Sequence, residues 1–244
     1  MIDRENDIKE YIVEKRTVTN NDLATHFDLS VQTIRKYLRN LESKGSIIRN
    51  HGGAKATSNF TDRLIVDVDS KRKIAKACAS LINNDDTIYI DSSSTYYFMV
   101  DYLPSDINVN IVTASVPLAI RLKDLTRCKV FLIGGYISDA TYGTYFPGSF
   151  SNISNIIFDK AFFGASGFSL EFEFTENNRE SLNFQHEIRK NSKKIIIGAS
   201  SSKEGRIGNQ KSFKFSEIDV FFTDKDISTE IKDKLNSELD LILL

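Results

Sequence analysis

Residues 30–41, with the sequence SVQTIRKYLRNL, decide the fold of the N-terminal part of this chain. Ser30 can accept a hydrogen bond from a free N–H group of a first helical turn, so a helix is expected to begin there. Val31, Ile34, Leu38 and Leu41 recur at helical spacing and predict one buried stripe. The opposite face carries amides, a hydroxyl and cations but no acid, namely Gln32, Thr33, Lys36, Arg39 and Asn40.

A small basic hairpin is expected after this helix. Gly45 suits the left-handed position just past a helix end. Residues 47–49 predict a short strand, and His51-Gly52-Gly53 predicts a tight turn. A helix with a basic outer face followed by such a hairpin is typical of a winged helix, which places the helix in a DNA groove and the hairpin beside phosphates.

Two further helices are expected before residue 30. Residues 3–16 place Ile8 and Ile12 on one face among charges, as in an amphipathic helix. Thr19 followed by Asp22 resembles a capping box and predicts the start of a second helix, which ends before a short turn into the third. This order is typical of a helix-turn-helix. The alternative is a three-helix domain whose polar face is only solvated.

The charge distribution favours the DNA-binding interpretation. The whole chain has a formal net charge of −1, but residues 1–29 carry four basic and seven acidic side chains. Residues 30–56 carry six basic side chains and one acidic side chain, Glu42. A solvated basic face would also explain this local excess, so the charge supports the helix and turn signals and does not replace them.

The composition is that of an ordinary globular protein, because 41% of the 244 residues are hydrophobic and 27% are charged. We expect no membrane span and no signal peptide, since no apolar run is long enough. Cys78 and Cys128 lie in apolar segments and are expected to be buried free thiols of a cytoplasmic protein. Three histidines without neighbouring ligands make a zinc site improbable.

The chain after residue 70 alternates between strands and helices. A helix is expected from Ser70, and later helices at 94–103, 116–125, 178–191 and 229–239. Short apolar strands are expected at 87–90, 109–112, 129–133, 161–163, 194–197 and 218–222. This alternation predicts a parallel sheet covered on both faces, in which ligands bind at the carboxyl ends of the strands.

Small hydroxyl residues follow several of these strands. Residues 91–95 (DSSST) follow the first strand, 113–115 the second, Gly134-Gly135 the third, and 200–203 (SSSK) the fifth. Such loops can offer hydroxyl and backbone N–H groups to an anion, and Lys203 adds a cation. The alternative is that each Ser or Thr only caps a helix. No nucleotide-binding glycine loop and no acid–base pair is present, so we expect no cofactor and no catalytic residues.

These motifs resemble the DeoR family of bacterial transcriptional regulators over nearly the whole chain. Within residues 31–54, VQTIRKYL, LESKG and RNHGGA are similar to the family patterns V-S-x-x-T-I-R-R-D-L, L-E-x-x-G and R-x-H-G-G-A. Residues 91–95, 112–115, 134–135 and 200–203 are similar to the sensor motifs D-S-G-T-T, V-T-N-S, G-G and D-x-S-K. Departures from the family patterns occur at Tyr37, Ser93, Ala114, Glu173, Gln185 and Ser200.

The resemblance implies an α/β protein with three parts. They are an N-terminal winged helix-turn-helix domain (1–56), a linker (57–69), and a C-terminal, mostly parallel α/β domain (70–244) that senses an effector and forms oligomers. The C-terminal domain would be similar to sugar-phosphate isomerases and would bind a phosphorylated sugar, which usually releases the DNA. The departures leave open whether this sensor takes a less anionic ligand or has lost sensing.

We therefore expect a repressor of a carbohydrate operon that binds operator DNA as a homodimer or homotetramer. An isomerase-like enzyme with a DNA-binding appendage, or an activator, are the alternatives. The residues expected to contact DNA are Thr19, Ser30, Gln32, Thr33, Arg35, Lys36, Arg39, Arg49 and His51. The residues expected to contact the effector are Asp91, Ser92, Ser93, Ser94, Thr95, Thr113, Ser115, Gly134, Gly135 and Lys203.

Overall fold

The chain divides into two compact units, Met1–Val68 and Asp69–Leu244, and each is described by itself. The computed structural model describes residues 4–43, 47–56, 60–138, 140–146, 148, 153–224 and 227–244. Gly45, the glycine expected to end the third helix, lies outside the described residues. None of the helices in these ranges is both long and apolar enough to cross a membrane.

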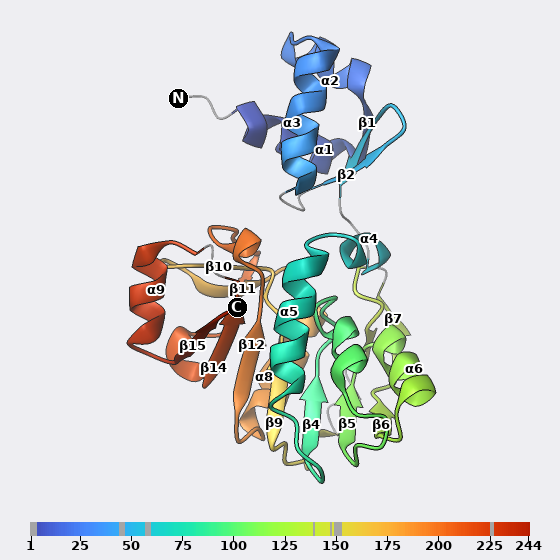
Figure 1. The fold of residues 1–244 in the computed structure, drawn as a ribbon, viewed down its shortest axis with the longest axis vertical. Coiled ribbons are helices and arrows are strands. Elements are labelled where there is room, and N and C mark those ends of the chain that lie inside the picture. The colour runs from blue at the N-terminus through green and yellow to red at the C-terminus, as the bar shows by residue number, and fades with distance from the viewer. Residues whose placement is uncertain are drawn as a thin grey trace. The chain divides into compact units, whose positions relative to one another are not determined.

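The N-terminal unit combines helices with a three-stranded antiparallel sheet (Figure 1). Its elements are α1 (Arg4–Lys15), β1 (Thr17–Thr19), α2 (Asn20–Phe27), α3 (Val31–Ser43), β2 (Ile47–Asn50), β3 (Gly53–Ala56) and α4 (Phe60–Leu64). The strand order is β1-β3-β2, with Val18 opposite Ala54. We call β2, the turn after it and β3 the wing. Strand β1 was not predicted, and α4 lies within the expected linker.

The N-terminal unit has its own hydrophobic core. Three members of the apolar stripe of α3, Ile34, Leu38 and Leu41, are at most 3% exposed, as the periodicity predicts. They pack in one cluster with Ile8, Ile12, Val18, Leu23, Ile47, Ala54 and Ala56. The cluster therefore joins α1, α2 and α3 to the wing.

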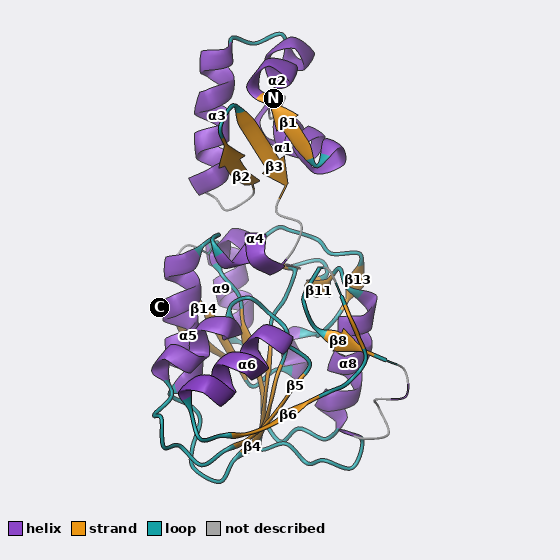
Figure 2. Ribbon diagram, turned by 90° about the vertical axis from the view of Figure 1, so that its right-hand side faces the viewer, coloured by secondary structure: helices purple, strands orange, loops and turns teal. Residues whose placement is uncertain are grey.

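The C-terminal unit contains a seven-stranded parallel sheet. Its strands are β4 (Thr87–Ile90), β5 (Asn110–Thr113), β6 (Lys129–Leu132), β9 (Lys160–Phe163), β12 (Ile195–Gly198), β14 (Val220–Thr223) and β15 (Asp240–Leu243). The larger helices are α5 (Val68–Ala79), α6 (Val116–Leu125), α8 (Arg179–Lys190) and α9 (Thr229–Asn236). Figure 2 shows the sheet nearly edge-on, with α5 and α6 over one face and α8 over the other.

The strand order defines a topological switch point. The order is β15-β14-β12-β9-β4-β5-β6, so the chain runs from β4 outward to β6 and then returns to β9 on the other side of β4. Ligands of such sheets bind outside the carboxyl ends of the strands where the order reverses. The loops after β4 and β9 are therefore the place to look for a ligand site.

Several predicted elements need correction. The sheet has a seventh strand, β15, beyond the six predicted. The helix expected at 94–103 is a 3-10 helix, η1 (Tyr96–Tyr102), because its turns close through bonds three residues apart, such as Tyr96 N–H to the Ser93 carbonyl. Short elements that were not predicted are β7 (Tyr136–Ile137), β8 (Thr144–Tyr145), β10 (Gly167–Ser169), β11 (Glu173–Glu176), η3 (Ser201–Lys203), β13 (Gln210–Lys211) and η4 (Phe215–Glu217).

Candidate functional site

The expected caps of α2 and α3 are both present. Thr19 Oγ1 accepts from Asp22 N–H at 3.1 Å while Thr19 N–H donates to the Asp22 carboxylate at 3.0 Å. Hydrogen bonding of the Asp22 carboxylate to the Thr19 side chain and to the Thr19 backbone N–H lowers the pKa of Asp22. Ser30 Oγ accepts from Thr33 N–H at 3.1 Å and lies 2.8 Å from Thr33 Oγ1. Thr19 and Ser30 thus hold the two helix starts in place through their side chains.

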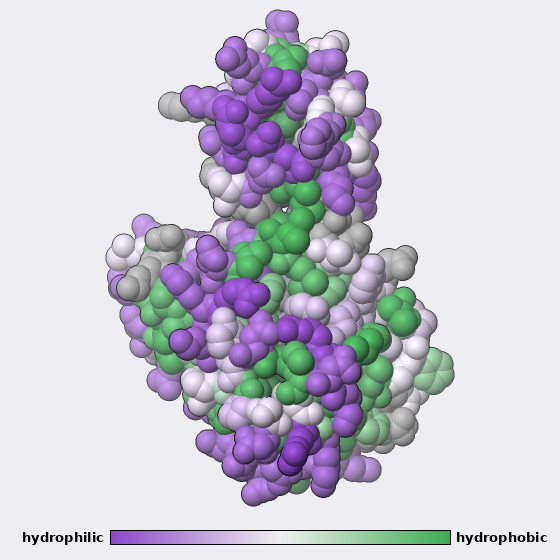
Figure 3. Space-filling view, turned by 45° about the vertical axis from the view of Figure 1, so that its right-hand side comes forward, coloured by the Kyte–Doolittle hydropathy of each residue, from purple (hydrophilic) through white to green (hydrophobic). Residues whose placement is uncertain are grey.

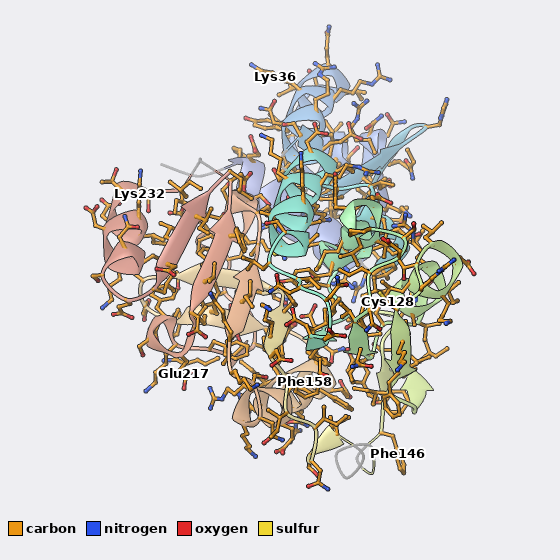
Figure 4. All side chains as sticks on the ribbon, turned by 60° about the horizontal axis from the view of Figure 1, so that its bottom comes forward. Lys36, Cys128, Phe146, Phe158, Glu217 and Lys232 are labelled. Atoms are coloured by element: carbon orange, nitrogen blue, oxygen red, sulfur yellow. The ribbon has the colours of Figure 1, made fainter. Side chains whose placement is uncertain are left out.

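The outer face of α3 is polar, basic and exposed. Arg35, Lys36 and Arg39 are exposed together with Gln32 and Asn40, whereas Thr33 is half-buried by its contact with Ser30. Figure 3 shows hydrophilic atoms over this part of the unit, and Figure 4 shows Lys36 at the outer surface. Side chains of this kind read base edges and bind phosphates in a DNA major groove.

The wing lies against α2 and not only against α3. Asn20 N–H donates to the Gly52 carbonyl at 2.7 Å. A Cβ atom on Gly53 would lie 2.0 Å from the Val18 carbonyl oxygen, so only glycine permits this approach of β3 to β1. The adjacent Gly52 has a φ of 98° in the tight turn. The turn predicted from the sequence is therefore confirmed. Gly52 supplies its positive φ, and Gly53 permits the close approach of β3 to β1.

Helix α3 and the wing border one open groove of about 540 Å³. The groove brings the predicted residues Arg35, Arg49 and His51 together. Arg49 is held there by Glu42, whose carboxylate accepts from the Arg49 backbone N–H at 3.2 Å and from its guanidinium at 3.3 Å. Glu42, at the end of α3, therefore positions the first strand of the wing.

In the C-terminal unit, Asp91 lies at the switch point itself. Its carboxylate accepts from Ser93 N–H, two residues on, and from Gly164 N–H after β9, both at 2.7 Å. Asp91 is 4% exposed, and this burial raises its pKa to about 7 against the lowering effect of the two N–H groups. Glu176 and Lys203 also interact electrostatically with Asp91, in opposite directions.

Tyr145 connects the other loops to this carboxylate. Its hydroxyl lies 2.9 Å from Ser92 Oγ and 3.2 Å from Thr141 Oγ1, and Ser181 at the start of α8 lies near it. The strand that carries it, β8, reaches the loop after β5, where Thr144 N–H donates to the Ala114 carbonyl at 2.8 Å. The loops after β4, β5 and β9 and the turn between β7 and β8 therefore meet around Asp91 and Tyr145.

The predicted effector residues occupy different positions around this cluster. Asp91, Ser92, Ser94, Thr95, Thr113 and Ser115 are buried, Ser93 and Lys203 are half-buried, and Gly134 and Gly135 are exposed. Ser115 Oγ accepts from Leu118 N–H at 3.3 Å and so caps α6. Lys203 Nζ donates to the Ala165 carbonyl at 2.5 Å.

Two expectations about backbone conformation come out differently. Ser93 stands where the family pattern has glycine, and its φ is not positive, so the backbone there does not require a glycine. Glu173 also stands where glycine was expected and does have a positive φ of 58°. Gly135 has a φ of 146° and its Cβ would lie 2.4 Å from the Tyr145 backbone, so its role is close packing against β8.

Sequence reasoning missed Tyr145, Gly164, Glu176 and the inward position of Gln185. Glu176 is half-buried and accepts from Ser166 Oγ at 2.7 Å and from the Asn178 N–H at 3.0 Å, beside the start of α8. Tyr145 and Glu176 lie in short strands, Gly164 in the loop after β9 and Gln185 on α8, and none of them belongs to a recognisable motif. The strand order is what brings Gly164 to Asp91.

Both units match known sequence families. Residues 4–60 match the DeoR-like helix-turn-helix domain, and residues 66–225 match the DeoR C-terminal sensor domain. The chain is 29% identical to the HTH-type transcriptional regulator GolR of Listeria innocua over 95% of this chain and 94% of that protein. It is 28% identical to the glycerol-3-phosphate regulon repressor of Escherichia coli over 91% and 90% of the two chains.

Among solved structures, ribose 5-phosphate isomerase A of Methanocaldococcus jannaschii is similar with a TM-score of 0.40 and 14% identity. The similarity covers 57% of this chain and 55% of the isomerase.

Proposed function

The chain belongs to the DeoR family of transcriptional regulators, and from this premise we propose that it represses a carbohydrate operon and responds to a phosphorylated sugar or related polyol. Its relatives with assigned roles are regulators and a repressor, which favours a regulator over an isomerase-like enzyme. We also propose a cytoplasmic location, which agrees with the free, buried thiols of Cys78 and Cys128.

The exposed polar face of α3 is the observation that carries the proposal. Gln32, Thr33, Arg35 and Lys36 would read base edges in the major groove, and Arg39 would contact the backbone. The wing would bind phosphate or the minor groove through Arg49 and His51, which border the same open groove as Arg35. Thr19 and Ser30 would donate to phosphates from the starts of α2 and α3.

The effector would bind at the switch point of the sheet. The cluster around Asp91 and Tyr145 supports this position, because four loops meet there at the carboxyl ends of parallel strands. Lys203 supplies a cation near Asp91. The remaining effector residues would contribute hydroxyl and N–H groups from the same edge, namely Ser92, Ser93, Ser94, Thr95, Thr113, Ser115, Gly134 and Gly135.

The C-terminal unit would also form the homodimer or homotetramer. The edge of the sheet supports this assembly, because Phe131 and Leu132 of β6 and Tyr136 and Ile137 of β7 are 40–58% exposed. Exposed apolar groups of this size mark protein contacts. A two-fold assembly would set the spacing of two DNA half-sites.

The decisive experiment replaces Arg35 and Lys36 by alanine. We expect the double variant to lose binding to a duplex selected from random sequence by the wild-type protein, with its melting temperature unchanged because both side chains are exposed. The slope of log affinity against log salt concentration should fall by about 2. A matched control, Lys76→Ala with Lys232→Ala, removes two exposed cations of the C-terminal unit, of which Lys232 is labelled in Figure 4.

The two double variants decide the assignment. Unchanged affinity and salt dependence in the Arg35 and Lys36 variant would contradict DNA reading by α3. Equal losses in both double variants would show that binding follows total charge rather than this face. Addition of the effector should weaken DNA binding if the protein is a repressor that releases its operator, and should strengthen it if the protein is an activator that needs its ligand.

A further inference from the structure

The amide of Gln185 is buried without a hydrogen-bond partner among the residues that the structure describes. Gln185 is 1% exposed, and neither its Oε1 nor its Nε2 atom has a partner within hydrogen-bonding distance. A buried, unpaired amide lowers the stability of a fold, whereas an apolar side chain of the same volume would not. Packing of the chain alone therefore gives no reason for a glutamine at this position.

Helix geometry aims the amide toward the effector site. Gln185 follows Ser181 by four residues, so the two lie one above the other on the buried face of α8. Helical side chains lean toward the helix N-terminus, and in α8 this is the end at which Ser181 approaches Tyr145. Phe184, the preceding residue, packs against Tyr145 with ring centroids 5.5 Å apart.

The same end of α8 adjoins the carboxylates of the site. Glu176 accepts from the N–H groups of Asn177 and Asn178, the latter being the cap of α8. Glu176 interacts electrostatically with Asp91, and Tyr145 bonds to Ser92 beside Asp91. The end of α8 toward which the Gln185 side chain leans therefore adjoins the cluster that the effector loops form.

The chemistry of an amide selects the group that it would bind. Nε2 donates hydrogen bonds and Oε1 accepts them, so both are satisfied only by a partner that accepts and donates. A phosphate oxygen accepts from Nε2 but is repelled by Oε1, and an ammonium satisfies Oε1 alone. Two neighbouring hydroxyls satisfy both atoms. The nearby carboxylates of Asp91 and Glu176 also favour hydroxyl donors over a second anion.

We propose that Gln185 binds a vicinal diol of the effector, with the phosphate of the same molecule placed toward Lys203. The proposal rests on the effector site put forward above and adds the class and the orientation of the ligand. The effector is a polyhydroxylated phosphate ester whose uncharged end faces α8. Gln185 then discriminates between ligands by their hydroxyls and not by their charge.

The test compares the wild-type protein with Gln185→Met, which keeps the side-chain volume and removes the amide. The probes are glycerol 3-phosphate, ribose 5-phosphate and fructose 6-phosphate, with inorganic phosphate as the reference, and affinity is measured by calorimetry. We expect the wild type to bind at least one ester more tightly than inorganic phosphate. The variant should bind that ester about tenfold more weakly or worse, and its melting temperature without ligand should equal or exceed that of the wild type.

Two further variants make the result specific. Ser212→Ala also removes a buried, unpaired polar group, 6% exposed, from another part of the unit and should keep the wild-type affinity. Gln185→Asn keeps the amide but withdraws it by one methylene, so it should lose affinity if Gln185→Met does not fold. Unchanged affinity in Gln185→Met, or in Gln185→Asn where Gln185→Met does not fold, would overturn the proposal.

DNA binding by the same preparations separates this proposal from the proposed function. A wild-type protein that binds duplex DNA but prefers none of the three esters over inorganic phosphate overturns the diol proposal and leaves DNA binding intact. A wild-type protein that selects no duplex overturns the proposed function instead, whatever the esters do.

Discussion

The two units use polar side chains in opposite ways. In the N-terminal unit, Arg35, Lys36 and Arg39 point away from a small apolar core and are exposed. In the C-terminal unit, Asp91 and Ser92 point inward, are 4% exposed and bond to residues far away in the sequence. The first arrangement presents groups to a large partner, whereas the second joins distant loops in a buried polar cluster. This difference explains why the exposed face of α3 appears in the sequence as a periodic pattern, whereas the buried cluster around Asp91 does not.

The largest expected effect tests whether the Asp91 carboxyl is truly an internal group. Burial raises its pKa to about 7, so the folded state binds this proton more tightly than the unfolded state does. Protonation of Asp91 therefore stabilises the fold. The resulting stability is fully present below about pH 4 and is lost as the pH rises through 7. Compared with Asp91→Asn, the wild type should lose up to about 4 kcal/mol of unfolding free energy over this range. Denaturant unfolding at several pH values measures the difference.

Asp159→Asn is the matched control for Asp91→Asn. The hydrogen bond from Lys193 and that from the Thr87 N–H lower the pKa of Asp159, so its contribution is present above about pH 4 and is lost as the pH falls. The two variants should therefore change the slope of stability against pH in opposite directions. Parallel slopes would show that Asp91 is solvated like a surface carboxylate.

The next largest effect tests whether the N-terminal unit depends on the close backbone packing of β1 against β3. Gly53→Ala places a methyl group 2.0 Å from the Val18 carbonyl oxygen, so β1 and β3 must separate. We expect a loss of ~3 kcal/mol in the stability of this unit, with weaker DNA binding as a result. Gly52→Ala is the control, because its Cβ meets no atom within 4 Å and only the positive φ opposes it, at about 1 kcal/mol. Hydrogen exchange of the β1 and β3 amides distinguishes the two variants, and equal protection would contradict the packing argument.

A smaller effect is expected from the cap of α2. Thr19→Ala removes the acceptor of the Asp22 N–H and should lower stability by about 1 kcal/mol. Thr19→Ser keeps the hydroxyl and should therefore have the stability and the DNA affinity of the wild type. If Thr19→Ala weakens DNA binding with no change in thermal unfolding, Thr19 contacts phosphate directly and its capping is secondary.

The smallest effect concerns the wing. Glu42→Gln weakens an exposed ion pair with Arg49, which is worth roughly 0.2–1 kcal/mol, so stability should scarcely change. DNA affinity should nevertheless change severalfold, because the released Arg49 no longer holds the wing in one register. Glu187→Gln, which removes a comparable exposed pair with Lys190, should change neither quantity. Identical DNA affinities for the wild type and both variants would mean that Glu42 does not position the wing.

The sequence predicts local features well and long-range features poorly, for physical reasons. The apolar stripe of α3 and the caps at Thr19 and Ser30 follow from contacts between residues three or four positions apart. Contacts this local appear directly in the sequence pattern. The bond between Asp91 and Gly164 joins residues 73 positions apart. Its existence depends on the order of the strands, which alternating helices and strands do not specify.

Short strands were missed for a related reason. Strand β1 has three residues and two exposed side chains, so it carries no alternating apolar signal, and it forms only because β3 pairs with it. Strand β15 has half-buried and exposed residues at the edge of the sheet. The departures at Gln185 and Glu173 were visible in the sequence, but the burial of one and the positive φ of the other were not.

The N-terminal core has a practical consequence for protein engineering. Every buried member of its cluster comes from residues 8–56, so the surface that faces DNA rests on side chains of its own segment. Such a segment can be exchanged between regulators as a cassette. Joining residues 1–56 to a different ligand-binding domain would combine the DNA preference of this protein with a new chemical signal, and synthetic gene circuits need such recombination.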